Sequence, residues 1–269
     1  MPKDFIEIKG KENGPTSIIV AGVHGDETCG IEVFKKILPT LSIKKGCILF
    51  VYGNPAAIKS NVRFVEANLN RMFKDDNLLS QKEKESYEYK RAQILKKYFN
   101  KSEVLLDIHA SSTPKSRPFI ICEANAREIV KYLPIKLIVS GFDNIEPGGT
   151  DYYMNKIGKV GICIECGYFN DSKSIKVAFD CIIAFLKIRG HLTTDLIPQK
   201  QSFINMNRLY LSKTNFKLSK LFDDFEKIKK GQLIGIDGDQ KILSSDDGYI
   251  LFARNIQQSN QEAFLFGKK

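Results

Sequence analysis

The segment GVHGDE, at residues 22–27, holds two side chains whose types and spacing suit metal chemistry. His24 and Glu27 are separated by two residues, and the segment directly follows the apolar run TSIIVA. If Glu27 lies in the first turn of a helix, its carboxylate and the imidazole can converge on one point. With a second imidazole they would form a His₂Glu set, which is typical of catalytic Zn²⁺ sites. An isolated His-x-x-Glu pair also recurs by chance, so the segment needs support from elsewhere in the chain.

Two further ionisable residues follow apolar runs of strand length. His109 ends the run EVLLDIH, and Glu165 stands in GICIECG. In open α/β sheets the carboxyl ends of the strands gather ligands, and a carboxylate there is costly to bury without a role or a partner. Each residue taken singly could be structural, but their common placement favours a metal centre with a base. Asp107 could hold the His109 imidazole or bond locally.

The stretch NPAAIKSNVRFVEANLNRMF, at residues 54–73, lies between the first two of these strand ends. It contains Arg63, Asn70 and Arg71. A guanidinium group presents a rigid fork of donors that suits carboxylates and polarised carbonyls. The stretch is therefore a candidate substrate-binding segment, and the alternative is a polar surface loop.

The elements that position these residues follow an alternating pattern as far as about residue 192. Apolar runs predict strands at residues 17–23, 47–52, 104–108, 119–122, 136–139 and 160–164, and amphipathic segments predict helices at residues 28–38, 81–98, 124–132 and 172–188. Near-continuous apolar strands are expected where helices cover both faces of a sheet. The pattern predicts an α/β fold with a mixed, largely parallel central sheet flanked by helices.

The pattern changes after the polar stretch at residues 193–201. GQLIGIDGDQ, KILSSDDGYILF and EAFLFGKK predict short strands, with hairpin-type turns at the pairs Asp237-Gly238 and Asp247-Gly248. We therefore expect a catalytic domain at residues 1–194 and a small β-rich C-terminal domain at residues 195–269.

The composition is that of a globular protein. Hydrophobic residues make up 43% of the 269 residues and charged residues 27%, which excludes a disordered or fibrous chain. No apolar run is long enough to span a membrane, and the first residues contain no apolar secretory segment. The six cysteines are scattered and predict reduced thiols. The pair Cys163 and Cys166 would point to opposite faces of a strand. We therefore expect a cytoplasmic protein with no membrane partner.

The formal net charge of +10 arises from 41 Lys and Arg against 31 Asp and Glu. Such a field could attract anionic substrates or nucleic acid. The charges are spread along the chain, however, and no basic run is interleaved with aromatic residues. We interpret them as a solvated surface and expect no nucleic-acid partner.

Four segments together resemble one protein family. GVHGDE, NPAAIKSNVRFVEANLNRMF, DIHASS and the glutamate of IECG, in this order, resemble the succinylglutamate desuccinylase/aspartoacylase family of the zinc carboxypeptidase superfamily. The matching motifs run from about residue 18 to residue 167. KKGQLIGIDGDQ and SSDDGYILF resemble the C-terminal domain of these proteins. The resemblance implies a zinc carboxypeptidase-like fold.

The resemblance also implies roles for the residues of the metal centre. His24, Glu27 and His109 match the ligands of one Zn²⁺ per chain. Glu165 matches the carboxylate that activates the attacking water. Arg63 matches an arginine that polarises the scissile carbonyl.

Substrate binding is implied for a second group of residues. Asn70 and Arg71 match residues that hold a substrate carboxylate. Lys115 and Arg117 have no such match: their charge makes them candidates for the acidic end of the substrate, and the alternative is that they are solvated side chains of a polar loop. The family usually has Asp where this chain has Asn68. That departure puts the charge balance around Arg71 in doubt.

The predicted activity is zinc-dependent hydrolysis of the amide bond of a small anionic N-acyl amino acid. Two alternatives remain open. One is a metallocarboxypeptidase or amidase that acts on peptide or cell-wall fragments, and the other is a non-catalytic binding protein on the same fold. A site covered by the second domain would favour a small substrate, whereas an open groove would favour a peptide. A homo-oligomer is compatible with the sequence.

Overall fold

The computed structural model describes residues 4–193 and 197–269. Its strands are β1 (Phe5–Lys9), β2 (Glu12–Ala21), β3 (Lys45–Tyr52), β4 (Val104–Ser111), β5 (Phe119–Cys122), β6 (Leu137–Ser140), β7 (Val160–Tyr168), β8 (Ser202–Leu211), β9 (Phe216–Leu218), β10 (Glu226–Ile228), β11 (Leu233–Asp237), β12 (Gln240–Leu243), β13 (Gly248–Leu251) and β14 (Glu262–Lys268). Its α-helices are α1 (Cys29–Ile37), α2 (Pro55–Ser60), α3 (Gln81–Glu85), α4 (Tyr87–Phe99), α5 (Arg127–Val130), α6 (Phe142–Ile145), α7 (Thr150–Lys156) and α8 (Lys173–Ile188). Short 3₁₀ helices are η1 (Leu69–Arg71), η2 (Asp76–Leu78) and η3 (Ala124–Ala126).

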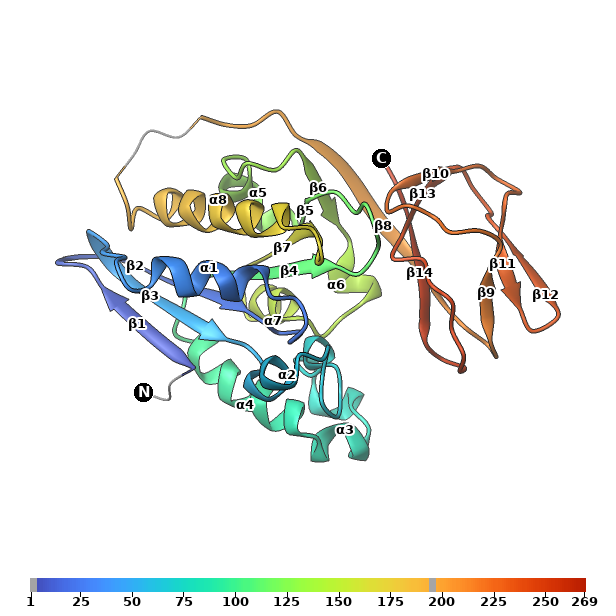
Figure 1. Ribbon diagram of the computed structural model, residues 1–269, viewed down its shortest axis with the longest axis horizontal. Helices are drawn as coiled ribbons and strands as arrows, with labels where there is room; N and C mark the ends of the chain where they lie inside the picture. Colours follow the sequence, from blue (N-terminus) through green and yellow to red (C-terminus); the bar gives the residue numbers. More distant parts are fainter. Residues whose placement is uncertain (1–3, 194–196) are drawn as a thin grey trace.

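The central sheet is mixed and mainly parallel in the part that carries the candidate site. Within the described residues it has eleven strands in the order β1-β3-β2-β4-β7-β5-β6-β8-β14-β13-β10. Strands β3, β2, β4 and β7 run parallel to one another, while β1 and β5 pair antiparallel with β3 and β7. Helices α1 and α8 cover one face, and α4 and α7 cover the other (Figure 1). The predicted fold class is confirmed.

Neighbouring residues of one strand belong to different halves of the core. Ile19 of β2 is packed in a cluster with Phe34 of α1 and Phe185 of α8. Its neighbour Ile18 belongs to the cluster that contains Leu95 of α4. Alternate side chains of a strand point to opposite faces, so a strand with helices on both sides must be apolar at every position. This requirement explains the uninterrupted apolar runs in the sequence.

Strand β8 joins the C-terminal strands to the same sheet. It pairs parallel with β6, with Val139 opposite Ile204, and antiparallel with β14, with Leu209 opposite Leu265. Strands β12, β11 and β9 form a second, three-stranded sheet at the far side of the tail (Figure 1). The expected domain boundary between residues 194 and 195 lies outside the described residues and stays a prediction.

The sequence predicted six of the seven strands before residue 194 and missed β1. It was also wrong about two local features. The helix expected over residues 81–98 is divided into α3 and α4, because the Ser86 hydroxyl accepts a hydrogen bond from Tyr89 N at 3.1 Å and begins a new helix. Asp237-Gly238 does form a hairpin between β11 and β12. Asp247-Gly248 does not, because β13 pairs with β10 and β14 instead of β12.

Two expectations from composition can be compared with the structure. None of the helices in the described part of the chain is long and apolar enough to cross a membrane. All six cysteines are free thiols. Cys163 and Cys166 lie in different core clusters, so the alternation expected for this pair is confirmed.

Candidate metal centre and active-site pocket

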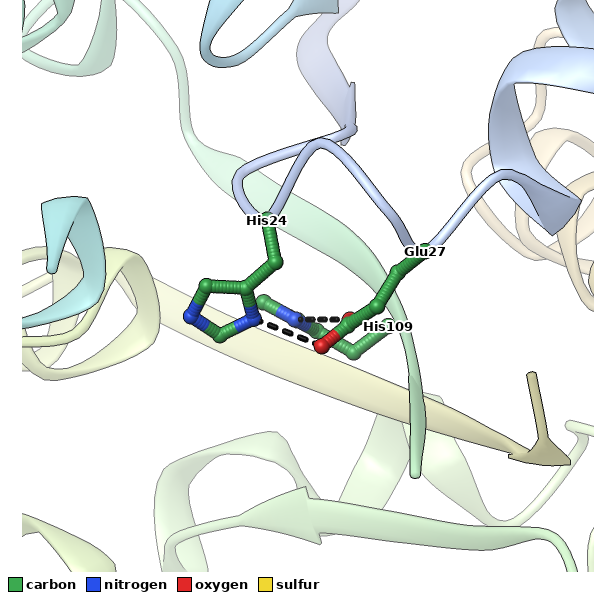
Figure 2. Close-up of side chains that lie close together, drawn as sticks. All are labelled: His24, Glu27 and His109. Atoms are coloured by element: carbon green, nitrogen blue, oxygen red, sulfur yellow. Dashed lines mark hydrogen bonds and ion pairs between the residues drawn. The ribbon is translucent and has the colours of Figure 1, made fainter. Parts of the chain in front are cut away.

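Three buried side chains converge where β2 and β4 lie side by side. His24 and Glu27 come from the turn after β2, and His109 lies in β4 (Figure 2). Glu27 Oε1 is 2.7 Å from His24 Nδ1, and Glu27 Oε2 is 2.9 Å from His109 Nδ1. One possible ligand atom from each residue lies within 4.8 Å of the others. The structure therefore brings together the three residues that the sequence analysis singled out as metal ligands.

The turn after β2 differs in one detail from the sequence expectation. Glu27 precedes α1 by two residues instead of lying in its first turn. A left-handed backbone at Gly22, with φ of +72°, starts the turn. Glu27 N then donates to the His24 carbonyl oxygen at 3.3 Å and closes it. The two side chains thus converge across a turn and not along a helix.

The outer nitrogens of both imidazoles are held by side-chain oxygens. His24 Nε2 is 3.0 Å from Asn68 Oδ1, and His109 Nε2 is 3.0 Å from Asp107 Oδ2. Thr150 Oγ1 donates to the same Asp107 oxygen at 2.5 Å. Because these oxygens accept hydrogen bonds, each Nε2 would keep its proton when a cation is bound, which leaves each Nδ1 free to serve as a ligand. This arrangement fits a divalent cation bound by two Nδ1 atoms and one carboxylate.

The Asn68 side chain therefore bonds to His24 and not to Arg71. Its Oδ1 also accepts from Asn70 N at 3.0 Å, which ties the metal centre to the candidate substrate-binding segment. The departure at this position was expected to disturb the charge balance around Arg71. The structure instead places a neutral amide where it fixes the orientation of a candidate ligand.

Electrostatics within the centre favour a bound cation. Burial would raise the pKa of Glu27, but His24 and His109 hold it well below its ordinary value. Burial lowers the pKa of His24, against the charge of Glu27. Against the effect of burial, Asp107 and Glu27 raise the pKa of His109 well above its ordinary value. A cation that binds here must therefore displace a proton from His109.

Glu165 lies beside the centre, on the neighbouring strand. Strands β4 and β7 are parallel, and their register places Glu165 directly opposite His109. The Glu165 side chain is buried, and its Oε2 has no hydrogen-bond partner among the described residues. Burial, followed by the negative charge of Glu27, raises the pKa of Glu165 to about 8. A buried carboxylate oxygen without a partner, aligned with a candidate ligand, is suited to accept a proton.

Arg63 reaches the centre from the loop after α2. Its Nη1 donates to Glu27 Oε1 at 2.9 Å. Its side chain is 40% exposed, which leaves other guanidinium nitrogens open to the pocket. The arginine can therefore hold the candidate ligand and still donate to a bound group.

Gly25 permits the close contact between the turn after β2 and the Arg63 loop. A Cβ at this position would lie 2.1 Å from the carbonyl carbon of Ala57, which is backbone and cannot rotate away. Gly25 N also donates to the carbonyl oxygen of Arg63 at 3.3 Å. The two loops can carry His24 and Arg63 to one centre because the residue between them has no side chain.

We expect Gly25→Ala to lower the free energy of unfolding by about 1–3 kcal/mol, because overpacking forces the backbone to move. It should also weaken Zn²⁺ binding by roughly tenfold or more, as the His24 turn is displaced. Thermal unfolding and competition with a chromogenic chelator measure the two effects. The control is Gly158→Ala, where a Cβ meets no atom within 4 Å but φ is +76°. It should lose stability without losing Zn²⁺ affinity, and equal affinity in the two variants would contradict the prediction.

The centre opens into a pocket of about 670 Å³. His24, Glu27, His109 and Glu165 lie in its wall, together with Arg63, Asn70 and Arg71. Residues of the tail, including Phe252, Arg254 and Glu262, complete the lining. This volume is in the range of sites for small molecules. The tail therefore forms part of the candidate site.

Arg71 lies in the pocket wall and is already paired. Its Nε and Nη2 donate to the two carboxylate oxygens of Glu262 at 2.9 and 3.0 Å, and Nη2 is 3.0 Å from Glu146 Oε1. Against the effect of burial, these two glutamates raise the pKa of Arg71. Asn70 Oδ1 accepts from Thr150 N at 3.2 Å. The sequence indicated Asn70 and Arg71 but neither glutamate, because no local motif marks Glu146 or Glu262.

The two basic residues after β4 have different positions. Lys115 lines the pocket and has a left-handed backbone, with φ of +63°. Arg117 is not among the described residues of the lining. Its guanidinium carbon instead lies 5.2 Å from the centre of the Phe225 ring, in a cation–π contact. Of these two candidate substrate-binding residues, the structure therefore brings only Lys115 into the pocket.

Comparisons with known proteins give a family match and related folds. A model of the succinylglutamate desuccinylase/aspartoacylase catalytic domain matches residues 13–178, more than half of the chain. A succinylglutamate desuccinylase of Pseudomonas syringae pv. tomato is 36% identical over 69 residues, which cover 24% of this chain and 21% of that protein. An N-acyl-aromatic-L-amino acid amidohydrolase (carboxylate-forming) of Xenopus tropicalis is 29% identical over 166 residues, which cover 56% of this chain and 53% of that protein.

Solved structures extend the likeness over the whole fold. A succinylglutamate desuccinylase from Vibrio cholerae has a TM-score of 0.82 at 20% identity, covering 99% of this chain and 85% of that one. The product-bound ectoine utilization protein EutE from Ruegeria pomeroyi has a TM-score of 0.75 at 20% identity, covering 98% and 88%. At these identities the likeness shows the fold alone. The matches to the curated relatives named above span between about a fifth and about half of their lengths.

Proposed function

Because the chain belongs to the succinylglutamate desuccinylase/aspartoacylase family, we propose that it is a zinc-dependent enzyme that hydrolyses the amide bond of a small N-acyl amino acid. The observation that carries the proposal is the convergence of His24, Glu27 and His109 in one buried centre, next to a carboxylate without a partner. This combination offers three protein ligands, an open side and a base. Those are the components of a metal-assisted hydrolysis.

His24, Glu27 and His109 would hold the cation through two Nδ1 atoms and one carboxylate. A divalent cation bound there would supply Lewis acidity towards the amide carbonyl and the attacking water. Asn68 and Asp107 act on the outer nitrogens and keep both imidazoles in the tautomer that presents Nδ1.

Glu165 carries the proton transfers in this proposal. Its Oε2 accepts a proton as the oxygen of water bonds to the carbonyl carbon, and the carboxyl group then gives that proton to the leaving nitrogen. The C–N bond breaks, and the products are a carboxylate and an amino acid with a free amine. Burial and the charge of Glu27 raise the pKa of Glu165 to about 8. A cation nearby would lower this pKa towards 7.

Arg63 is placed to stabilise the negative charge that develops on the carbonyl oxygen. Its contact with Glu27 orients the guanidinium at the centre, and its remaining donors face the pocket. Donors that are already oriented need little rearrangement during the reaction. Asn70 and Arg71, and further out Lys115, are the proposed contacts for the carboxylate of the substrate.

Two observations favour this proposal over the alternatives. The tail helps to line the pocket, so the site suits a small molecule better than a long peptide. A protein that only binds a ligand has no need of the unpaired Glu165 oxygen, whose burial is unfavourable without a function. The six free thiols support the cytoplasm as the proposed compartment.

The decisive test is metal analysis followed by an amine-release assay. We expect purified protein to contain about one Zn²⁺ per chain and to release amine from at least one acetyl or succinyl amino acid. Dialysis against a chelator should abolish release, and added Zn²⁺ should restore it, because the ligand set remains intact. Metal-free protein with full activity, or zinc-loaded protein that is inactive on every N-acyl amino acid, would contradict the proposal.

A further inference from the structure

Thr150, the first residue of α7, holds the carboxylate that orients His109. Its side chain is buried, and its Oγ1 donates to Asp107 Oδ2 at 2.5 Å. The same oxygen is 3.0 Å from His109 Nε2. Asp107 is fully buried, and its Oδ1 has no hydrogen-bond partner in the described part of the chain. The position of this carboxylate, and with it the orientation of the imidazole, therefore depends on the Thr150 hydroxyl.

The backbone of Thr150 holds a second residue of the site. Thr150 N donates to Asn70 Oδ1 at 3.2 Å, which leaves Asn70 Nδ2 to donate to a carboxylate in the pocket. A Cβ at Gly149 would lie 3.3 Å from Asn70 Oδ1 and 2.5 Å from Oδ1 of Asp151, which also lines the pocket. The Asn70 amide can approach this turn because Gly149 has no side chain. Its orientation is thus fixed before a substrate binds.

The backbone of Asn70 is held independently of Thr150. Asn70 N donates to Asn68 Oδ1 at 3.0 Å, and that oxygen also lies 3.0 Å from His24 Nε2. Loss of the contact with Thr150 N would therefore release the Asn70 amide but leave the Asn68 contact with His24 in place. The hydroxyl and the N–H of Thr150 consequently act on different halves of the site.

We propose that Thr150 is a positioning residue for both halves of the active site. Its hydroxyl orients His109 through Asp107, and its N–H aims the Asn70 amide at the carboxylate of the substrate. The second contact rests on the proposed function, whereas the first concerns cation binding alone. Loss of the hydroxyl should therefore weaken cation binding, and loss of the N–H should weaken substrate binding.

A purely structural role for Thr150 gives a different expectation. The residue is buried at the start of a helix, so its replacement could lower stability without touching the site. In that case the folded variant would bind Zn²⁺ and substrate as the wild type does. Metal affinity and KM, measured on folded protein, therefore separate the two roles.

The first experiment removes only the hydroxyl. Thr150→Val keeps the branched shape and the N–H, and chelator competition on the metal-free protein should show a roughly tenfold loss of Zn²⁺ affinity. KM at saturating Zn²⁺ should stay close to the wild-type value. Thr150→Ser restores the hydroxyl and should restore the affinity.

The second experiment removes the N–H as well. Proline is accepted at the first position of a helix, and Gly149, with φ of −74° and ψ of 172°, has the extended backbone that a residue before proline needs. Thr150→Pro should match Thr150→Val in Zn²⁺ affinity. Its KM for an N-acetyl or N-succinyl amino acid that the wild type cleaves should be about threefold to tenfold higher than that of Thr150→Val.

Thr214→Val is the matched control. Thr214 Oγ1 donates to Asp237 Oδ1 at 2.9 Å in the tail, and neither residue belongs to the described lining of the pocket. The substitution removes the same kind of hydrogen bond, from a threonine to an aspartate, at a distance from the site. It should keep both the Zn²⁺ affinity and the KM of the wild type.

Two results would overturn the inference. One is wild-type Zn²⁺ affinity in folded Thr150→Val, or the same loss in Thr150→Ser. The other is equal KM in Thr150→Val and Thr150→Pro. If Thr150→Pro does not fold, the comparison of Val with Ser still decides the role of the hydroxyl. Because Zn²⁺ affinity is measured without substrate, wild-type protein that binds Zn²⁺ but releases no amine would refute the proposed function separately.

Discussion

Glu165→Gln is expected to cut turnover by roughly two to four orders of magnitude while the protein still binds one Zn²⁺ per chain. The amide keeps the shape of the side chain but cannot take a proton from water. Glu165 contributes no atom to the candidate ligand set, so the affinity for the cation should change little. Steady-state amine release and metal analysis on the same preparation measure both quantities.

The matched control for this variant is Glu128→Gln, an exposed glutamate on α5 that is remote from the pocket. It should retain wild-type turnover. If Glu165→Gln were as active as the wild type, another group would have to carry the proton. If Glu165→Gln lost its Zn²⁺, Glu165 would be a ligand and not a base.

His24→Ala is expected to lower Zn²⁺ affinity by more than about a hundredfold and to abolish amine release. Removal of a direct ligand should exceed the roughly tenfold to hundredfold loss typical of changes to the groups that orient ligands. The imidazole also links Glu27 to Asn68, so its loss frees the amide that connects the centre to Asn70. Chelator competition gives the affinity, and amine release at saturating Zn²⁺ gives the residual activity.

The remaining histidine outside the centre supplies the control. His191 is buried, with Nδ1 2.9 Å from the Lys45 carbonyl oxygen and Nε2 2.9 Å from Ser17 Oγ. Its replacement by Gln should lower stability but leave Zn²⁺ stoichiometry and turnover per folded molecule unchanged. If His24→Ala bound Zn²⁺ normally, His24 would not be a ligand.

The sequence predicted that the candidate ligands would converge, because the signals for this part of the site are local. Apolar runs defined β2, β4 and β7, and parallel strands in one sheet carry the residues at their carboxyl ends to the same region. His109 and Glu165 occupy equivalent places in two such runs, and the register of β4 and β7 places them opposite each other. Strand pattern and residue type together indicated which side chains would meet, and the family resemblance supplied their roles as candidate ligands and base.

The substrate side of the pocket could not be predicted in the same way. Arg71 and Glu262 are 191 residues apart, and their contact depends on how β14 packs against the catalytic part. Asp151 follows the turn PGGT, in which no pattern distinguishes a pocket carboxylate from a helix-capping one. Asn68 was recognised as unusual, but only the structure shows that it contacts His24. Contacts between distant residues and the direction of loop side chains depend on tertiary packing. No local sequence pattern indicates them.

Strand β8 also has a consequence for self-association. Its backbone pairs with the outer edge of β6 on one side and with β14 on the other. The outer edge of β6 is therefore not left unpaired. An unpaired strand of this kind is a template for aggregation and for domain swapping. Because β8 covers that edge and β14 also supplies Glu262 to the pocket, the tail both closes one side of the sheet and completes the lining of the pocket.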